Sequence, residues 1–166
     1  MKKLYVVGNK VSKSLSPTIF NYWFKKYNIK ASYGYLELTE KNFHNKIKDI
    51  LEKKDTLGLN VTIPFKNKII KHLGKIDAHA KKIGAVNCVT NKKTINGTNT
   101  DWTGYYKTLP NIKKTKNRKV IILGYGGASH AIHYVLKKRG FKDILIFNRS
   151  KKKIKYSKNT EYTKKY

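Results

Sequence analysis

The chain has 166 residues, a length that fits one ordinary domain, or a small domain with part of another, and that can bury a core. Its 38 lysine and arginine residues against 9 acidic ones give a net charge of +29, but only three are arginines, which favours a solvated lysine surface over a specific nucleic-acid reader. One cysteine, no run of membrane-spanning length and no signal-peptide pattern exclude disulfide-linked and membrane classes, so we expect a soluble cytoplasmic protein.

The first third of the chain alternates strand and helix patterns. The apolar run of residues 4–8 ends in glycine and predicts a buried strand. Ser16 and Pro17 have the pattern of an N-cap followed by proline at the first helical position, which predicts a helix over residues 17–28. A β-prone run over residues 31–38 and a second helix starting at Thr39 follow, so the order is β-α-β-α.

The middle of the chain continues with shorter elements. The pattern predicts a strand at 57–63, helices at 66–73 and 78–83, a hairpin formed by 85–90 and 94–98, and a linking helix at 101–109. The lysine-rich stretch of residues 113–119 resembles a domain boundary.

A βαβ pattern begins after that stretch, with strands at 120–123 and 143–147 and a helix at 131–139. Between the first strand and the helix lies a glycine-rich turn. Glycines there let the backbone approach a pyrophosphate, while the helix N-terminus offers free N–H groups. The context therefore predicts dinucleotide binding by Gly124, Gly126, Gly127 and Ala128.

The second strand of this βαβ pattern lacks the acidic residue that usually binds the ribose 2′-hydroxyl of NAD. Asn148, Arg149 and Ser150 follow it instead, with Lys153 shortly after. A guanidinium, a hydroxyl and an ammonium group suit a 2′-phosphate, so we expect NADP rather than NAD. The alternative is that the lysines at 151–153 belong only to a basic tail. The five histidines show no metal-site pattern, and we expect no metal.

Six motifs occur in the order found in shikimate dehydrogenases, and the chain resembles that family over about residues 1 to 153. They are a serine pair (Ser14, Ser16), Asn-Val-Thr-Ile-Pro-Phe-Lys (60–66), Gly-Ala-Val-Asn (84–87), Asn-Thr-Asp (99–101), Gly-Tyr-Gly-Gly-Ala (124–128) and Asn-Arg-Ser (148–150). The resemblance implies an α/β fold, with an N-terminal α/β substrate-binding domain followed by the first βαβ unit of a Rossmann-type NADP-binding domain.

The resemblance also implies roles for individual residues. Ser14 and Ser16 would bind the substrate carboxylate, and the ring hydroxyls would be held by Asn60, Thr62, Asn87 and Asp101. Lys66 and Asp101 would form the catalytic pair, a proton donor and a carboxylate beside the reacting oxygen. Simpler roles stay open: Ser16 or Asp101 as a helix cap, Thr62 as an ordinary strand residue, and Lys66 as a surface lysine.

The resemblance implies NADPH-dependent reduction of 3-dehydroshikimate to shikimate, with residues 1–101 as substrate domain, 102–117 as linking helix and linker, and 118–166 as partial cofactor domain. Family members continue with further strands and helices, so we expect the chain to be truncated in its cofactor-binding half. Two residues depart from the family pattern. Trp102 replaces a glycine, and Tyr125 replaces a small residue, where its side chain would either crowd the pyrophosphate or point outward.

Two other classes of function stay open. One is a catalytically inert module that binds shikimate without turnover. The other is a polyanion-binding protein driven by its lysines, whose affinity would fall steeply with salt. An open sheet edge would also favour a homodimer or a complementing chain.

Overall fold

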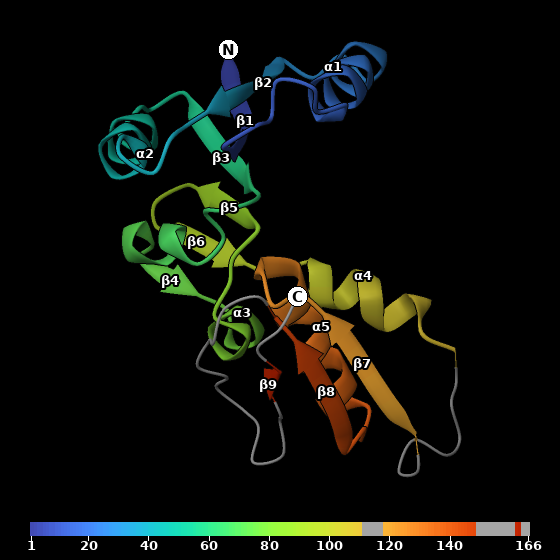
Figure 1. The fold of residues 1–166 in the computed structure, drawn as a ribbon. Coiled ribbons are helices and arrows are strands. Elements are labelled where there is room, and N and C mark those ends of the chain that lie inside the picture. Colours follow the sequence, from blue (N-terminus) through green and yellow to red (C-terminus); the bar gives the residue numbers. More distant parts are fainter. Residues whose placement is uncertain (111–117, 149–161, 164–166) are drawn as a thin grey trace. The chain divides into compact units, whose positions relative to one another are not determined.

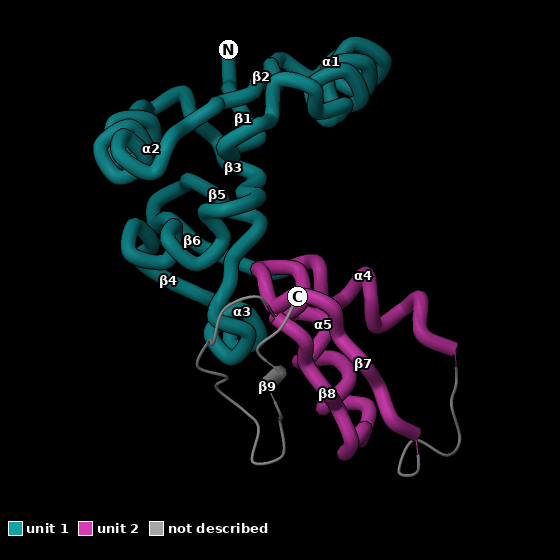
Figure 2. The backbone as a smooth tube through the Cα atoms, in the orientation of Figure 1, with its two compact units in different colours: residues 1–99 teal, residues 100–166 magenta. Residues whose placement is uncertain are grey.

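The structure, a computed structural model, describes residues 1–110 and 118–148 and the backbone of residues 162–163. The chain divides into two compact units, Met1–Asn99 (unit 1) and Thr100–Tyr166 (unit 2) (Figure 2). Each unit is an α/β structure with its own sheet, which confirms the expected fold class.

Unit 1 contains a six-stranded sheet with the strand order β2-β1-β3-β5-β6-β4 (Figure 1). Its strands are β1 (Lys2–Gly8), β2 (Ala31–Glu37), β3 (Thr56–Val61), β4 (Lys75–Ile76), β5 (Cys88–Asn91) and β6 (Ile95–Thr98). β1 pairs in parallel with β2 and β3, whereas β5 runs antiparallel to both β3 and β6. The predicted hairpin is therefore confirmed as β5 and β6.

The helices of unit 1 are α1 (Ser16–Lys26), α2 (Phe43–Leu51), α3 (Ala78–Ile83) and the 3-10 helix η1 (Lys68–His72). Alternate residues of β1 face opposite sides of the sheet. Val6 packs in a cluster with Tyr33 and Phe20, whereas Val7 packs in a cluster with Phe43. Thus α1 covers one face of the parallel strands and α2 covers the other (Figure 1).

Two helices of unit 1 begin later than predicted. The helix expected to start at Thr39 begins at Phe43, because the Thr39 N–H donates to Asn42 Oδ1 (2.9 Å) and the Asn42 N–H donates to Thr39 Oγ1 (3.4 Å) in a preceding turn. The helix predicted at 66–73 is a single 3-10 segment at Lys68–His72. The local turn at Thr39 and Asn42 thus displaced the start of α2.

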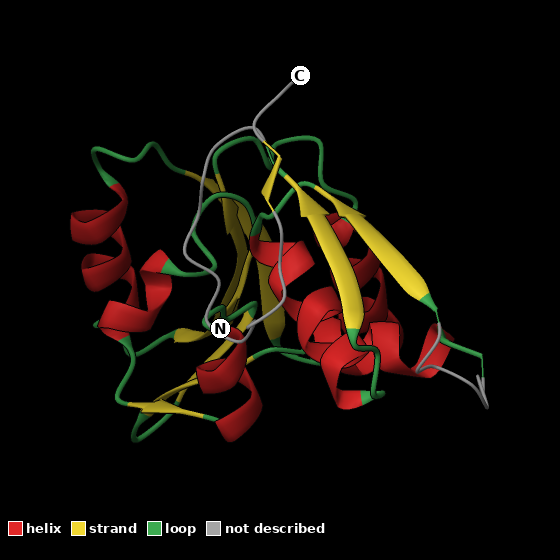
Figure 3. Cartoon of the chain, turned by 60° about the horizontal axis from the view of Figure 1, so that its bottom comes forward, coloured by secondary structure: helices red, strands yellow, loops and turns green. Residues whose placement is uncertain are grey.

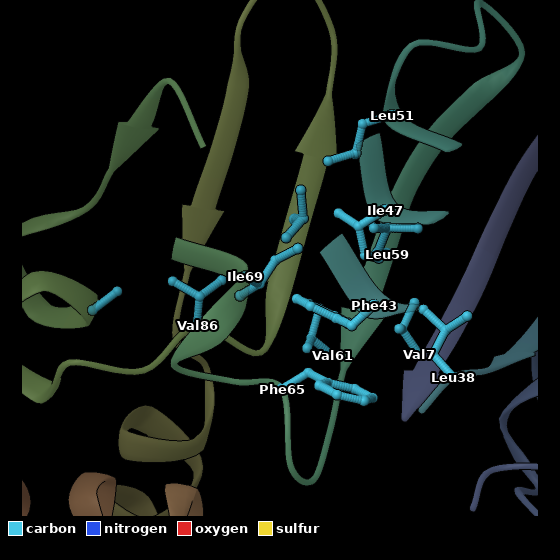
Figure 4. Close-up of a cluster of buried hydrophobic side chains, with 12 residues drawn as sticks. Val7, Leu38, Phe43, Ile47, Leu51, Leu59, Val61, Phe65, Ile69 and Val86 are labelled. Carbon is cyan, nitrogen blue, oxygen red and sulfur yellow. The ribbon is translucent and has the colours of Figure 1, made fainter. Parts of the chain in front are cut away.

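The larger core of unit 1 lies between the sheet and α2 (Figure 4). The rings of Phe43 and Phe65 stack at a centroid distance of 4.2 Å, and both side chains are fully buried. Phe65 belongs to the predicted substrate motif, so the segment that carries Lys66 is anchored in this core. The buried members are Val7, Leu38, Phe43, Ile47, Leu51, Leu59, Val61, Phe65, Ile69, Ala80, Val86 and Val89.

Unit 2 contains α4 (Asp101–Thr108), β7 (Lys119–Leu123), α5 (Gly127–Lys138), β8 (Asp143–Phe147) and β9 (Tyr162–Thr163). β8 pairs in parallel with both β7 and β9, and β9 was not predicted from the sequence. Ile122, Ile144 and Ile146 are buried in one cluster with Leu136 of α5. α5 lies along one face of β7 and β8 (Figure 3), and it begins four residues before the predicted Ala131 because the end of the glycine turn is helical.

Candidate active site

Three segments of unit 1 that carry predicted substrate residues meet, together with the end of β6, at one edge of its sheet. The parallel strands β1 and β3 end at this edge, β5 begins there and β6 ends there. The Val61 N–H donates to the Asn87 carbonyl (2.8 Å), and the Asn87 N–H donates to the Thr98 carbonyl (3.1 Å). The Val86 N–H donates to the Lys66 carbonyl (2.7 Å), which fixes the backbone of the Lys66 segment to the segment of Asn87.

Gly8 permits the close approach of the loops that follow β1 and β3. The Thr62 N–H donates to the Val7 carbonyl (2.8 Å). A Cβ on Gly8 would lie 2.5 Å from Val11 Cγ1, 2.7 Å from Thr62 Cγ2 and 3.2 Å from the Ile63 carbonyl oxygen. The sequence indicated Gly8 only as the end of a strand, because two of the three close contacts come from Thr62 and Ile63, more than fifty positions away.

The serine pair lies at the start of α1. Ser16 is the first helical residue, and the N-cap position belongs to Leu15, so the interpretation of Ser16 as an N-cap is wrong. The Ser16 N–H instead donates to Ser14 Oγ (3.2 Å), and both residues are half-buried. Hydroxyl groups beside the N-terminus of an 11-residue helix suit an anion, because the positive end of the helix dipole adds to them.

Glu37 holds the loop that carries Ser14, a role that sequence analysis missed. Its Oε2 accepts hydrogen bonds from the N–H groups of Ser12 (2.9 Å) and Val11 (3.0 Å). Hydrogen bonds from Ser12, then from Val11, lower the pKa of the Glu37 carboxyl. The scarcity of acidic residues in this chain was the available signal that a carboxylate at the end of β2 has a defined contact.

Asn60 lies on the α1 face of β3, between the core residues Leu59 and Val61 that face α2. The Tyr33 hydroxyl donates to Asn60 Oδ1 (2.8 Å). Burial raises the pKa of Tyr33 to about 12, so the hydroxyl keeps its proton at neutral pH. Cys88 pairs directly opposite Asn60 in the antiparallel ladder, so the two side chains share one face of the sheet.

Lys66 and Asp101 belong to different units. Lys66 is half-buried and precedes η1 in unit 1. Asp101 is the first residue of α4 in unit 2, and the N-cap position belongs to Thr100. The alternative that Asp101 is the cap residue is therefore wrong, although a carboxylate in the first turn still complements the helix dipole. The pairing of Lys66 with Asp101 stays a prediction.

Asn99, the first residue of the predicted Asn-Thr-Asp motif, is a buried polar residue directly after β6. It is 3% exposed, and its Nδ2 donates to the Ala85 carbonyl (2.9 Å). Because Ala85 lies two residues before Asn87, this bond ties the first residue of the Asn-Thr-Asp motif to the segment of Asn87. The sequence marked Asn99 as part of a motif but not as a structural contact.

The glycine turn of unit 2 has the backbone expected of a phosphate-binding loop. Gly124 adopts a φ of 85°, a left-handed conformation that favours glycine. A Cβ on Gly124 or Gly126 would meet nothing within 4 Å, so space beside the turn is open. Gly127 and Ala128 lie in the first turn of the 12-residue α5, where their N–H groups are not used within the helix. These features fit a dinucleotide phosphate.

Asn148 fixes the same turn from the end of β8. Its Oδ1 accepts from the Tyr125 N–H (3.0 Å), and the Gly124 N–H donates to the Phe147 carbonyl (2.7 Å). The other predicted cofactor residues, Arg149, Ser150 and Lys153, lie outside the residues that the structure describes.

Tyr125 neither points outward nor stands over the glycine turn. Its side chain is 6% exposed and packs in the core of unit 2, with its hydroxyl 3.0 Å from His133 Nδ1. Burial lowers the pKa of His133 to about 4, with smaller effects of Lys137 and His130. Trp102, the other departure from the family pattern, contacts the rings of Tyr106 and Tyr134 within unit 2.

Two classes of site find no support in the described parts of the chain. Among residues 1–110 and 118–148, no three histidine, cysteine or acidic side chains are grouped so that they could hold a metal ion. None of the helices described above is both long and apolar enough to cross a membrane.

Residues 6–89, just over half of the chain, match the family model of the shikimate dehydrogenase substrate binding domain. The chain is 38% identical over 148 residues to shikimate dehydrogenase of Thermotoga petrophila, covering 89% of this chain and 55% of that protein. It is 38% identical over 161 residues to shikimate dehydrogenase (NADP(+)) of Pelagibacter ubique, covering 92% and 58%. The chain thus spans little more than half the length of these relatives.

Solved structures are similar over the same extent. The crystal structure of shikimate dehydrogenase from Aquifex aeolicus matches with a TM-score of 0.79 and 36% identity, over 90% of this chain and 56% of that one. Shikimate dehydrogenase 1 from Peptoclostridium difficile matches with a TM-score of 0.83 and 31% identity, over 98% and 61%. The chain therefore belongs to the shikimate dehydrogenase family, with residues 6–89 as its substrate binding domain.

Proposed function

We propose that the chain acts in the NADP-dependent reduction of 3-dehydroshikimate to shikimate, a step of chorismate and aromatic amino acid biosynthesis, and that it does so in the cytoplasm. One observation carries the proposal: segments that carry hydroxyl, amide and ammonium side chains suited to a small polyhydroxylated acid are held together by backbone pairing at one edge of the unit 1 sheet. These side chains belong to Ser14, Ser16, Asn60, Thr62, Lys66 and Asn87. A relative from Thermus thermophilus, 27% identical with a TM-score of 0.74, was solved in complex with NADP(H) and shikimate.

The serine pair would bind the carboxylate of the substrate. Ser14 and Ser16 lie at the positive end of α1, where their hydroxyl groups would donate hydrogen bonds to an anion. Asn60, Thr62 and Asn87 would then bind the ring hydroxyls from β3 and the start of β5. This arrangement recognises an acid and a polyol at two ends of one small molecule.

Lys66 and Asp101 would act at the reacting oxygen. NADPH, when bound, would supply a hydride to the carbonyl carbon of the substrate. The Lys66 ammonium would donate a proton to the carbonyl oxygen as the carbon–oxygen π pair moves to it, and the Asp101 carboxylate would orient that ammonium. Asp101 lies three residues after Thr98, the last residue of β6. The covalent chain therefore limits the distance between the Cα atoms of Thr98 and Asp101 to roughly 11 Å.

The glycine turn would hold the pyrophosphate of NADP through Gly124, Gly126, Gly127 and Ala128, while Asn148 fixes its shape. Arg149, Ser150 and Lys153 would bind the 2′-phosphate, because their side chains offer hydrogen-bond donors, two of them charged, to an anion. The absence of an acidic residue at this point of the sequence supports NADP over NAD.

The direct test is NADPH formation from shikimate and NADP by the purified chain. Lys66→Ala removes the proton donor and should reduce kcat by about 100-fold or more, the usual contribution of a general acid. Lys71→Ala removes an exposed lysine five positions later and is the matched control, which should keep the wild-type rate. Equal rates in wild type and Lys66→Ala would contradict the proposed role of Lys66.

Cys88 offers a test of binding that does not need turnover. It is the one cysteine of the chain and shares a sheet face with Asn60, so shikimate bound there should slow its reaction with a thiol reagent. Protection that requires Ser14 but comes without turnover would favour an inert shikimate-binding module. Binding of nucleic acid that falls steeply with salt, with no protection by shikimate, would favour the polyanion-binding alternative.

A further inference from the structure

Tyr33 lies between the two elements that would hold opposite ends of the substrate. Its side chain comes from β2 and is 3% exposed. Its ring stacks on Phe20 of α1 with centroids 4.6 Å apart and an interplanar angle of 7°. The serine pair lies at the start of α1, and Asn60 lies on β3, so Tyr33 contacts both the helix and the strand.

Asn21 of α1 also fastens the backbone of Tyr33. Its Nδ2 donates to the Tyr33 carbonyl, and its Oδ1 accepts from the Tyr33 N–H, both at 2.8 Å. β2 is the outermost strand of the sheet on this side, so the carboxamide of Asn21 completes its edge as a neighbouring strand would. With the ring stacked and the backbone doubly bonded, the position of the Tyr33 hydroxyl is fixed relative to α1.

The hydroxyl of Tyr33 determines the orientation of Asn60. It donates to Asn60 Oδ1 at 2.8 Å, so this oxygen is already an acceptor within the protein. A carboxamide with its oxygen held this way presents Nδ2, which has two N–H donors and no acceptor capacity.

We propose that Tyr33 is a positioning residue, which fixes the carboxamide of Asn60 relative to the serine pair so that Asn60 Nδ2 donates a hydrogen bond to a ring hydroxyl oxygen of the substrate. The inference rests on the proposed function and deepens it. Tyr33 itself does not contact the substrate. It sets the distance and angle between the carboxylate site on α1 and the hydroxyl site on β3.

Tyr33→Phe tests this inference, because it keeps the ring stack and removes only the hydroxyl. Shikimate binding should weaken about five- to tenfold, the worth of one hydrogen bond. Tyr35→Phe is the matched control, since Tyr35 lies two residues further along β2 and is 56% exposed, and its affinity should equal the wild-type value. Wild-type affinity in Tyr33→Phe would overturn the inference.

A double-mutant cycle separates positioning from general damage to the fold. If Tyr33 acts through Asn60, the variant with both Tyr33→Phe and Asn60→Ala should bind no more weakly than Asn60→Ala alone. If the two losses multiply, Tyr33 acts elsewhere and the inference fails. Fluorescence of Trp23 in α1 checks that each variant is folded.

A measurement without substrate keeps this inference distinct from the proposed function. The side-chain amide signal of Asn60 is assigned by its loss in Asn60→Ala. Its heteronuclear NOE should show more fast motion in Tyr33→Phe than in the wild type, and no increase in Tyr35→Phe. An equally rigid amide in Tyr33→Phe would overturn the inference. If the wild-type chain binds no shikimate, the proposed function fails, while the amide measurement still decides whether Tyr33 orients Asn60.

Discussion

The two units use the same α/β construction, but they cover their sheets differently. In unit 1, α1 covers Val6 on one face of β1, and α2 covers Val7 on the other. In unit 2, Ile122 of β7 is buried in the cluster that contains α5 residues, whereas Ile121 and Leu123 on the opposite face are 55% and 78% exposed. Parallel strands are normally covered on both faces, so we expect unit 1 to be the more stable unit.

The two tryptophans of the chain allow this comparison to be measured. Trp23 lies in unit 1 and contacts Phe20, and Trp102 lies in unit 2 and contacts Tyr106 and Tyr134. Variants with Trp23→Phe or Trp102→Phe therefore report the unfolding of one unit at a time. Before any further substitution, we expect two unfolding transitions in denaturant, with unit 2 unfolding at the lower concentration. The substitutions described below are compared with this behaviour.

The largest expected effect is on the core of unit 1. Phe65→Ala removes a fully buried ring that stacks on Phe43, and we expect a loss of about 3–5 kcal/mol in the unfolding of this unit. Denaturant titration followed by Trp23 measures it. Ile121→Ala in unit 2 removes an exposed side chain and should change stability little. A similar loss in both variants would contradict the inference that helices cover both faces of the parallel strands in unit 1 but only one face in unit 2.

Acid should affect unit 2 more than unit 1. The pKa of His133 is lowered to about 4, first by burial, then by Lys137 and His130. The unfolded chain binds this proton near pH 6.5, so protonation favours unfolding. The contribution of neutral His133 to the stability of unit 2 is fully present above about pH 6.5. It is lost as the pH falls toward 4, by roughly 3 kcal/mol in total.

Trp102 fluorescence in denaturant at several pH values measures this loss. In unit 1 the pKa of His72 is also lowered, by burial first and then by His44 and Lys71, but its ring is partly exposed, so the acid effect there should be smaller. His133→Gln should remove most of the pH dependence of unit 2. An unchanged acid transition in that variant would assign the effect to another group.

Gly8→Ala should damage unit 1 at the candidate site. The added Cβ would meet Val11, Thr62 and the backbone of Ile63, so we expect a loss of about 1–3 kcal/mol and weaker protection of Cys88 by shikimate. Trp23 fluorescence and thiol-reaction rates measure the two effects. Unchanged stability together with unchanged protection would show that the loops have room to move apart.

The smallest expected effect is a gain in unit 2. Gly104 lies inside α4, and a Cβ there would meet nothing within 4 Å, so Gly104→Ala should stabilise the unit by about 1 kcal/mol through helix propensity. Trp102, which lies in the same helix, reports the gain through its fluorescence in denaturant. No change would contradict the expected gain from helix propensity at this position.

Periodicity predicted the fold well where long-range packing and local preference agree. The hairpin of β5 and β6 and the strand β8 follow from their patterns. The helix predicted at 66–73 is instead the shorter 3-10 helix Lys68–His72, and the Lys66 carbonyl accepts a hydrogen bond from Val86, in another part of the chain. The short strand β9 pairs with only two residues of β8 and has no periodic signal.

The sequence by itself determined the family, the order of the elements and the residue types available for an acid, a polyol and a dinucleotide, because each depends on short motifs and local spacing. The tertiary structure decided which residues support them. Tyr33 reaches Asn60 across β1, Glu37 holds the loop of Ser14, and Asn99 ties Ala85. These contacts join residues far apart in the chain, and only the packing of strands and helices brings their hydrogen-bonding groups within reach.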